Sequence, residues 1–320
     1  MMVAVLALLA CTSPRGSDGA SSGADGGAAD DTAGDTGSSG VPDPSVYDCR
    51  AERVPDRVNP IDPACMVDRT CKTRLVSGHR GMGGTFGAVA PENTVSAVRA
   101  AIAYGVDYVE TDPRPTADGV LVNVHDTTVD RTTDGEGTVS EMTLAEVQAL
   151  HIEAGDLPGD FSCERIPTFR EILETARGRV HVLVDANKTD RVDLLVADIV
   201  ETDSVDWAIF DTSSVDKIDQ ALAIEPDLYT MIRVDTEEQL DEQLAHFADH
   251  PPVIVEIDDT TPELAEPVLA AGHRPLRDIF VQDLIVVGAE DYAEYDAAFA
   301  EGMLIAQSER PELVLDYLGR

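Results

Sequence analysis

Residues 77–86 of this 320-residue chain read SGHRGMGGTF, residues 91–112 read PENTVSAVRAAIAYGVDYVETD, and residues 118–126 read DGVLVNVHD. Short apolar, strand-like runs end at two histidines and at a pair of acids, and one helical segment lies between them. Glu110 and Asp112 are separated by one residue, so on a strand they share one face, about 6–7 Å apart along the backbone. Two such acids can hold one Mg²⁺ or Ca²⁺, because both cations prefer oxygen ligands. The alternative is a solvated strand end that binds no cation.

The two histidines of this stretch, His79 and His125, each follow the C-terminal end of an apolar run. A single histidine in such a place is commonly a hydrogen-bonded structural residue, but two that flank an acidic pair favour acid/base chemistry. Arg80 carries a permanent charge, and its planar guanidinium can bind a phosphate through two hydrogen bonds; otherwise it is a surface cation. The stretch therefore predicts a metal-assisted acid/base site.

In order and spacing, five short motifs of this stretch resemble those of the glycerophosphodiester phosphodiesterase family, part of a wider superfamily of phospholipase-type phosphodiesterases. They are His79-Arg80-Gly81, Pro91-Glu92-Asn93-Thr94, Glu110-Thr111-Asp112, Asp118-Gly119 and His125-Asp126. The resemblance extends more weakly from about Arg74 to the C-terminus. It implies an α/β fold, a TIM (β/α)8 barrel, with its site at the C-terminal ends of the strands. It also implies one divalent cation, with His79 and His125 as the catalytic pair.

The resemblance implies roles for residues outside the acid pair. Glu92 is expected near the cation and the substrate, its alternative being a charge at a helix start. Family members usually carry Glu-x-Lys after the third strand, and here Asp185 takes the place of the acid as third metal ligand. Lys188 stands one residue later than the expected lysine, so it reaches the substrate phosphate only if the chain bulges. The family's Thr-Asp-x-Pro after the eighth strand is replaced by residues 307–312, and the only tryptophan, Trp207, lies at the fourth strand rather than the seventh.

Composition limits the partners of the chain. Its formal net charge is −38, so we expect no electrostatic binding of nucleic acid or of an anionic bilayer. The hydrophobic content of 43% is enough for a large core. A length of 320 residues fits one barrel of about 250 residues preceded by a leader.

The N-terminal part predicts a bacterial lipoprotein. Residues 1–11 form a short apolar signal that ends Leu-Leu-Ala-Cys, in which Cys11 would be lipidated, although no basic residue precedes it. Residues 12–46 are rich in Gly, Ser, Ala and Asp and predict a disordered tether, so the barrel is expected over residues 47–320. We therefore expect an exported protein anchored to a membrane on its periplasmic or cell-surface side. An ordinary signal peptide is the alternative.

Four further cysteines predict two disulfides in an exported chain. They are Cys49, Cys65, Cys71 and Cys163. Three pairings are possible, and we favour one bridge within the segment before the barrel and one from that segment to Cys163. A metal site and free buried cysteines are the alternatives, but the chain has no Cys-x-x-Cys.

Alternation of strand-like and helix-like segments supports a barrel independently of the motifs. The expected strands are residues 75–78, 106–112, 180–185, 206–210, 228–234, 253–257, 279–287 and 303–306. The expected helices begin near residue 95 and include residues 143–150, 192–200, 215–223, 237–247, 263–271 and 292–300. The run at 120–124 before His125 is expected to be an insertion outside the barrel.

We expect an enzyme, a metal-dependent phosphoric diester hydrolase that cleaves glycerophosphodiesters to glycerol 3-phosphate and an alcohol. The metal ligands and phosphate contacts on this hypothesis are Glu110, Asp112, Asp185, Arg80 and Lys188, with His79 as base and His125 as acid. A lysophospholipase D or sphingomyelinase D-like activity is an alternative, which an extended apolar groove at the barrel mouth would favour. A second alternative is a surface-binding lipoprotein without catalysis.

Overall fold

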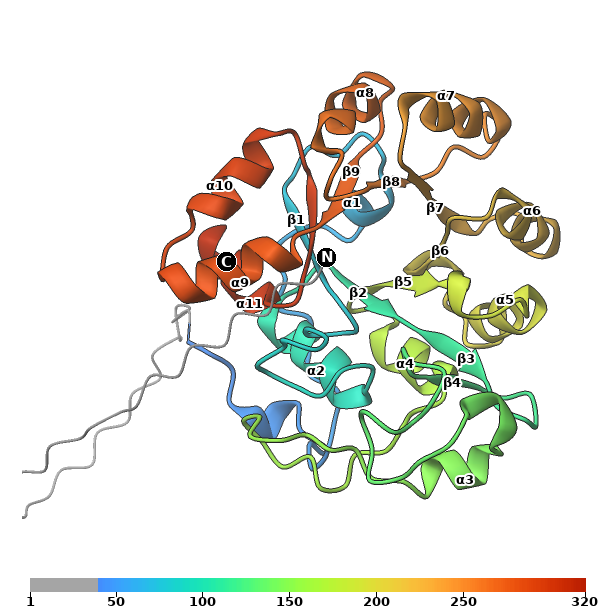
Figure 1. Cartoon of the computed structure of the whole chain (residues 1–320), viewed down its shortest axis with the longest axis vertical. Coiled ribbons are helices and arrows are strands. Elements are labelled where there is room, and N and C mark those ends of the chain that lie inside the picture. The colour runs from blue at the N-terminus through green and yellow to red at the C-terminus, as the bar shows by residue number, and fades with distance from the viewer. Residues whose placement is uncertain (1–39) are drawn as a thin grey trace, which may run out of the picture. The chain divides into compact units, whose positions relative to one another are not determined.

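The computed structural model describes residues 40–320, in which eight parallel strands close into a barrel (Figure 1). The order around the barrel is β1-β10-β9-β8-β7-β6-β5-β2. The strands are β1 (Leu75–Gly78), β2 (Tyr108–Thr111), β5 (His181–Asp185), β6 (Ala208–Thr212), β7 (Tyr229–Val234), β8 (Ile254–Ile257), β9 (Pro275–Asp278) and β10 (Ile305–Ser308). The expected TIM barrel is thereby confirmed. The predicted lipobox at Cys11 and most of the predicted tether lie outside the described residues and stay predictions.

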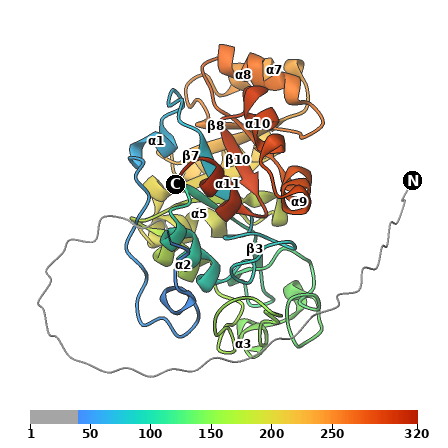
Figure 2. The same ribbon diagram turned by 90° about the vertical axis from the view of Figure 1, so that its left-hand side faces the viewer.

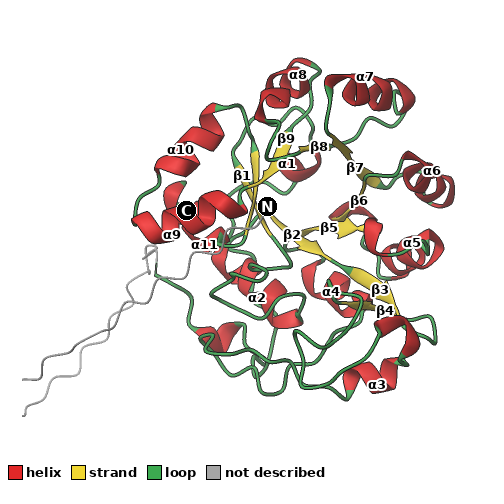
Figure 3. Ribbon diagram, in the orientation of Figure 1, coloured by secondary structure: helices red, strands yellow, loops and turns green. Residues whose placement is uncertain are grey.

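Most of the helices follow the barrel strands and form the outer layer of the barrel, whereas α1 precedes β1 and α3 lies in the insertion after β4 (Figure 3). They are α1 (Ala64–Val67), α2 (Val95–Tyr104), α3 (Leu144–Gln148), α4 (Phe169–Ala176), α5 (Val192–Glu201), α6 (Val215–Ile224), α7 (Glu237–His246), α8 (Ala265–Ala270), α9 (Phe280–Ala289), α10 (Ala293–Ala300) and α11 (Pro311–Tyr317). None of those within residues 40–320 is long and apolar enough to cross a membrane. The start of α2 shows how the sequence sets these boundaries, because the hydroxyl of Thr94 accepts the backbone N–H of Ala97 and Gly105 ends the helix at a φ of 82°.

The seventh strand was predicted at the wrong place. Residues 279–287 form most of helix α9, and the strand is β9, Pro275–Asp278. The run is almost continuously apolar, and in such a run periodicity alone does not separate a strand from a helix. Ile279, Asp283 and Val286 are its buried positions, which is helical spacing, while four large apolar side chains of α9 are exposed. These are Val281, Leu284, Ile285 and Val287.

The insertion that carries His125 lies outside the barrel, as predicted. Strands β3 (Pro113–Pro115) and β4 (Leu121–Asn123) form a separate antiparallel pair. Figure 1 shows this pair beside α4, with which β4 is in contact, and Figure 2 shows β3 and α3 in the lower half of the molecule. The insertion has its own small core, which includes Val122, Val124 and Val147. His125 is therefore held by a packed unit of its own.

Side chains inside the barrel form two layers. The layer nearer the N-terminal ends of the strands is apolar and packs as one cluster: Leu75, Tyr108, Leu183, Ile209, Met231, Ile254, Leu276 and Ile305. Two residues later on every strand the inward side chain is polar: Ser77, Glu110, Asp185, Asp211, Arg233, Glu256, Asp278 and Gln307. The polar layer lies toward the C-terminal ends, where TIM barrels carry their sites.

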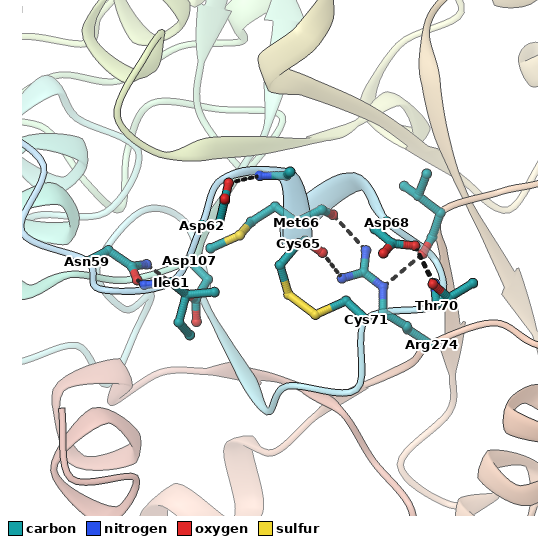
Figure 4. The surroundings of a disulfide bond; sticks show 12 residues. Asn59, Ile61, Asp62, Cys65, Met66, Asp68, Thr70, Cys71, Asp107 and Arg274 are labelled. Carbon is teal, nitrogen blue, oxygen red and sulfur yellow. Dashed lines mark hydrogen bonds between the residues drawn. A yellow bond between two sulfur atoms is a disulfide. The ribbon is translucent and has the colours of Figure 1, made fainter.

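The segment before β1 closes the opposite end of the barrel. Arg274 is fully buried there and donates to the carbonyl oxygens of Cys65 (2.7 Å) and Met66 (2.6 Å), beside the Cys65–Cys71 disulfide (Figure 4). A second disulfide joins Cys49 to Cys163. Both pairings agree with the favoured prediction, and with a sealed lower end the polar layer is reached from the C-terminal side.

Candidate active site

Three carboxylates meet at the C-terminal end of the barrel. Glu110 lies on β2, Asp112 directly after it, and Asp185 ends the neighbouring strand β5. All three are buried, and each offers an oxygen within 4.8 Å of the others. Carboxylate oxygens at such spacing fit Mg²⁺ or Ca²⁺. Within residues 40–320 this is the one group of acids, histidines or cysteines with metal-ligand spacing.

The charges of these acids act on one another. Burial raises the pKa of Glu110 well above its usual value, and the charges of Asp112 and Asp185 raise it further. Burial also acts to raise the pKa of Asp185, but the nearby Arg233 and Lys188 more than offset this and lower it. The charges of Asp112 and Asp185 thus disfavour the ionised form of Glu110, and a bound cation would relieve this repulsion.

Lys188 reaches the acids even though it stands one residue later than expected. Its Nζ lies 3.4 Å from an oxygen of Asp112 and 3.3 Å from an oxygen of Asp185. The cause is the 3₁₀ turn η3 (Ala186–Lys188), which replaces strand alternation directly after β5. Asn187, at the expected place of the lysine, instead donates its backbone N–H and its side-chain amide to Asp185.

His79 is held between two carboxylates and a ring. Its Nδ1 lies 2.6 Å from Oε1 of Glu309, and its Nε2 lies 3.8 Å from Oε2 of Glu110. The ring stacks on Phe280 at 4.4 Å between centroids. Glu309 also accepts the backbone N–H of Phe86. The ring is thus fixed with Nε2 on the side of the acids.

His125 is held by a different carboxylate. Its Nδ1 lies 2.9 Å from Asp126, which Arg131 binds in turn at 2.7 Å. Hydrogen bonds from Arg131 lower the pKa of Asp126 to about 2, so this acid stays charged at neutral pH. Arg114 fixes the backbone by donating to the carbonyl of His125. One third of the His125 side chain is exposed, against 12% for His79.

Arg80 lies beside the acids in a left-handed backbone conformation, with φ at 53°. This turn lets its backbone N–H donate to Glu110 at 2.9 Å. Its guanidinium binds Glu92 at 3.0 Å, and Glu92 also accepts from Arg131. Among the described residues the Nε of Arg80 is buried without a hydrogen-bond partner. Glu92 therefore links Arg80 to Arg131, the arginine that holds the His125–Asp126 pair.

Asn93 supports the acids from behind. Its side-chain amide donates to Asp112 at 2.7 Å and its oxygen accepts the backbone N–H of the same residue. Thr94 caps α2. The three residues after Pro91 thus differ in role: Glu92 links two arginines, Asn93 holds Asp112, and Thr94 caps α2.

Six polar residues around the acids were not predicted from the sequence: Asp211, Arg233, Glu256, Asp278, Gln307 and Glu309. Five of them belong to the inward layer described above, and the signal that reveals them is a polar residue two positions after an inward apolar one on each strand. Arg233 makes a two-point ion pair with Asp211 and lies 3.3 Å from Glu256. Burial raises the pKa of Glu256 well above its usual value.

Two separate cavities are lined by residues that are linked to the acids, one through Glu92 and Arg80 and the other through Arg233. The first, called here the loop groove, has a volume of about 540 Å³ and lies between the loop after β1 and the insertion. It is lined by Ala88, Ala90, Pro91, Ile152, Ala154, Leu157, Glu92 and Arg131, among others. The second, called here the rim pocket, has a volume of about 290 Å³ and lies over the ends of β7 and β8.

Comparison with known proteins supports one family. The model of the "Glycerophosphoryl diester phosphodiesterase family" matches residues 79–277. A glycerophosphodiester phosphodiesterase of Caldanaerobacter subterraneus is 46% identical over 101 residues, which are 31% of this chain and 39% of the relative. Human glycerophosphodiester phosphodiesterase 1 is 41% identical over 113 residues, 35% of this chain and 34% of the relative. The chain thus aligns with about two fifths or less of these relatives' length.

Solved structures extend the likeness over the whole barrel. A glycerophosphoryl diester phosphodiesterase from Parabacteroides distasonis superposes with a TM-score of 0.70 at 24% identity, over 82% of this chain and 93% of its own. One from Agrobacterium tumefaciens gives 0.58 at 27%, over 75% and 99%. An Oleispira antarctica phosphodiesterase, solved with the product sn-glycerol-3-phosphate, gives 0.63 at 23%, over 78% and 98%. With its motifs gathered at one end of a barrel of this kind, the chain belongs to the glycerophosphoryl diester phosphodiesterase family.

Proposed function

We propose that this protein hydrolyses glycerophosphodiesters to sn-glycerol 3-phosphate and an alcohol, with one Mg²⁺ or Ca²⁺ held by Glu110, Asp112 and Asp185. The observation that carries the proposal is that three buried acids from two strands meet beside His79, whose Nε2 lies 3.8 Å from Glu110. Each of the two histidines is also oriented by a further carboxylate. The product bound to the Oleispira phosphodiesterase, which shares the fold, supports the same substrate class.

The donor set fits a hard divalent cation. Three carboxylates supply oxygen ligands, and the raised pKa of Glu110 reflects negative charge that a cation would balance. When bound, the cation would polarise the phosphodiester and neutralise charge that develops on its oxygens. Mg²⁺ and Ca²⁺ both suit such ligands.

Two basic residues are placed to bind the phosphate. Lys188 lies against two of the acids, and its side chain is 18% exposed. Nε of Arg80 makes no hydrogen bond among the described residues and lies 3.7 Å from Oδ2 of Asp112, and the pairing of a terminal nitrogen with Glu92 fixes the guanidinium. Fixed donors of this kind stabilise charge that grows on phosphoryl oxygens in the transition state.

The histidines divide the proton transfers. Each has Nδ1 against a carboxylate, which leaves Nε2 free to exchange a proton with the substrate. We assign His79, which lies deeper and beside the acids, as the base that activates the nucleophile. His125, more exposed on its loop, gives a proton to the leaving alcohol. The nucleophile is water, or a substrate hydroxyl that first closes a cyclic phosphate.

Two substrates with different leaving groups test this function and the division of roles. The full chain should release glycerol 3-phosphate from glycerophosphoethanolamine and from the p-nitrophenyl ester of glycerol phosphate. His79→Ala should lower kcat/KM on both esters by roughly 10²–10⁴-fold, the usual range for loss of a general base. His125→Ala should do so only on the ethanolamine ester, because p-nitrophenolate leaves without a proton donor.

The exposed His250 offers a matched control, since His250→Ala should match the unmodified chain on both esters. Equal losses on both esters for His125→Ala would contradict its role as acid. If neither ester releases glycerol 3-phosphate, the proposed function is contradicted.

The loop groove favours a second candidate, a lysophospholipase D-like activity. Its apolar side chains lie beside Glu92 and Arg131, so an acyl chain could rest there with the phosphate at the acids. Leu157→Asp should then lower kcat/KM for lysophosphatidylethanolamine about tenfold or more, because a charge would meet the acyl chain, and leave glycerophosphoethanolamine unaffected. Equal effects on both substrates would remove this candidate.

A further inference from the structure

The rim pocket is open at the barrel mouth and has a charged lining. Strands β7 and β8, the end of β6 and helix α7 contribute its walls, which are Ser213, Arg233, Val234, Asp235, Gln239, Gln243, Glu256, Ile257 and Asp258. Its volume of about 290 Å³ lies near the lower limit of ordinary small-molecule sites. It is therefore large enough for a small alcohol but not for a lipid tail.

Negative charge dominates this lining. Arg233 is its one basic residue, against the acids Asp235, Glu256 and Asp258. The charge of Arg233 is already matched, because its guanidinium makes a two-point ion pair with Asp211 behind it. Within residues 40–320, Oε2 of Glu256 is a buried oxygen with no hydrogen-bond partner, although it lies 3.3 Å from Nε of Arg233. A buried carboxylate oxygen that accepts no hydrogen bond, and that faces an arginine already paired with Asp211, favours a ligand that brings positive charge and an N–H.

The rim pocket adjoins the acids that are proposed to hold the cation. Nη2 of Arg233 lies 3.7 Å from Oδ1 of Asp185. The loop groove meets the site on the other side, at Glu92 and Arg131. A diester phosphorus between these two openings would extend one alcohol into each of them.

We propose that the rim pocket binds a primary ammonium group carried by one alcohol of the diester, with Glu256 as the residue that determines this specificity. The proposal rests on the proposed function. A primary ammonium has three N–H donors for carboxylate oxygens. A quaternary ammonium has none and is bound mainly by aromatic faces, and no aromatic side chain of the described chain lines the pocket. Nor do its acids have metal-ligand spacing.

Three substrates that share glycerol 3-phosphate test the pocket: glycerophosphoethanolamine, glycerophosphocholine and glycerophosphoglycerol. The full chain should show the highest kcat/KM on the ethanolamine diester. Glu256→Gln keeps the shape of the side chain and removes its charge, so kcat/KM on that diester should fall about tenfold or more, the scale of one buried charge pair. The value for the glycerol diester should stay within about twofold.

Two further variants separate charge from folding. Asp235→Asn removes a charge from the lining at an exposed position. It should therefore also lower the ratio of kcat/KM on the ethanolamine diester to kcat/KM on the glycerol diester. Glu242→Gln removes an equal charge from the outer face of α7, outside the pocket, and should leave the ratio unchanged.

The outcomes distinguish this inference from the function on which it rests. If all three diesters are cleaved with equal kcat/KM, or if Glu256→Gln lowers all three equally, the ammonium pocket is wrong and the phosphodiesterase stands. If no diester is cleaved, the proposed function fails. Calorimetry that compares ethanolamine with its neutral isostere propanol then tests whether the pocket binds an ammonium group. Tighter binding of ethanolamine that is lost in Glu256→Gln supports it, and equal binding overturns it.

Discussion

His79 shows how a single residue of this site depends on a distant one. Its imidazole is fixed by Glu309, 230 residues away in sequence, and by stacking on Phe280. The charge of Glu309 is secured in turn, because the hydrogen bond from His79 and the N–H of Phe86 lower the pKa of its carboxyl although burial acts to raise it. Glu309 is thus a positioning residue for the proposed base.

Removal of this support should affect turnover more than binding. Glu309→Ala should lower kcat about 10–100-fold, the range found for partners that orient an active-site histidine, with KM within about twofold. Glu309→Gln keeps an oxygen toward Nδ1 and should recover part of the loss. Steady-state kinetics of the two variants measure this split. An equal rise of KM, or no difference between the two variants, would contradict a positioning role.

Local spacing revealed some site residues and could not reveal others. Glu110, Asp112 and Asp185 were predicted because each follows a strand-like run, and the structure brings them together. Glu309 was not, because nothing local pairs residue 309 with residue 79. Glu309 lies in the segment that replaces the family's Thr-Asp-x-Pro, where Ser308-Glu309-Arg310-Pro311 keeps a hydroxyl, an acid and a proline in the same order.

At the scale of elements, periodicity located seven of the eight strands and failed at α9. The strand it missed, β9, has the sequence Pro-Leu-Arg-Asp, in which only one residue is plainly apolar. The apolar run directly after β9, residues 279–287, instead predicted a strand. The turn η3 is the other local feature that a strand pattern does not show, and it decides where Lys188 lies.

The two disulfides should differ in their contribution to stability. Cys49–Cys163 closes a loop across 114 residues and Cys65–Cys71 one across 6. On the chain-entropy model, the double serine variant at Cys49 and Cys163 should lose about 2.6 kcal/mol more unfolding free energy than the variant at Cys65 and Cys71. Urea unfolding of both variants and the oxidised chain measures the difference. Equal losses would contradict the entropic account.

At the scale of the whole molecule, the barrel places a polar layer over an apolar one. The family motifs and the alternation of segments were enough to predict this architecture. Which side chains share a layer inside the barrel depends on the register of neighbouring strands, and the sequence alone does not show this register.

His181 is buried at the N-terminal edge of β5 and stacks on Trp207 at 4.6 Å between ring centroids.

His181 should make the folded chain sensitive to acid. Burial, with the charges of Arg57 and Arg274, lowers the pKa of His181 to about 3. The folded state therefore binds this proton less readily than the unfolded state, and stability is lost as the pH falls from about 6.5 toward 3. Between pH 7 and pH 4 the unmodified chain should lose about 3 kcal/mol more unfolding free energy than His181→Phe, which keeps a ring on Trp207. Parallel losses in urea unfolding at both pH values would contradict this.

The central claim is that the acids at Glu110, Asp112 and Asp185 serve a cation-dependent diester hydrolysis. The most direct measurement is the release of glycerol 3-phosphate from glycerophosphoethanolamine by the full chain, with Mg²⁺, with Ca²⁺ and with EDTA, beside Glu110→Gln. We predict turnover with at least one of the cations, none with EDTA, restoration when the cation is returned, and a loss of about 10²-fold or more in Glu110→Gln at subsaturating cation. Turnover that persists in EDTA, or a Glu110→Gln chain with unchanged cation dependence, would contradict the account.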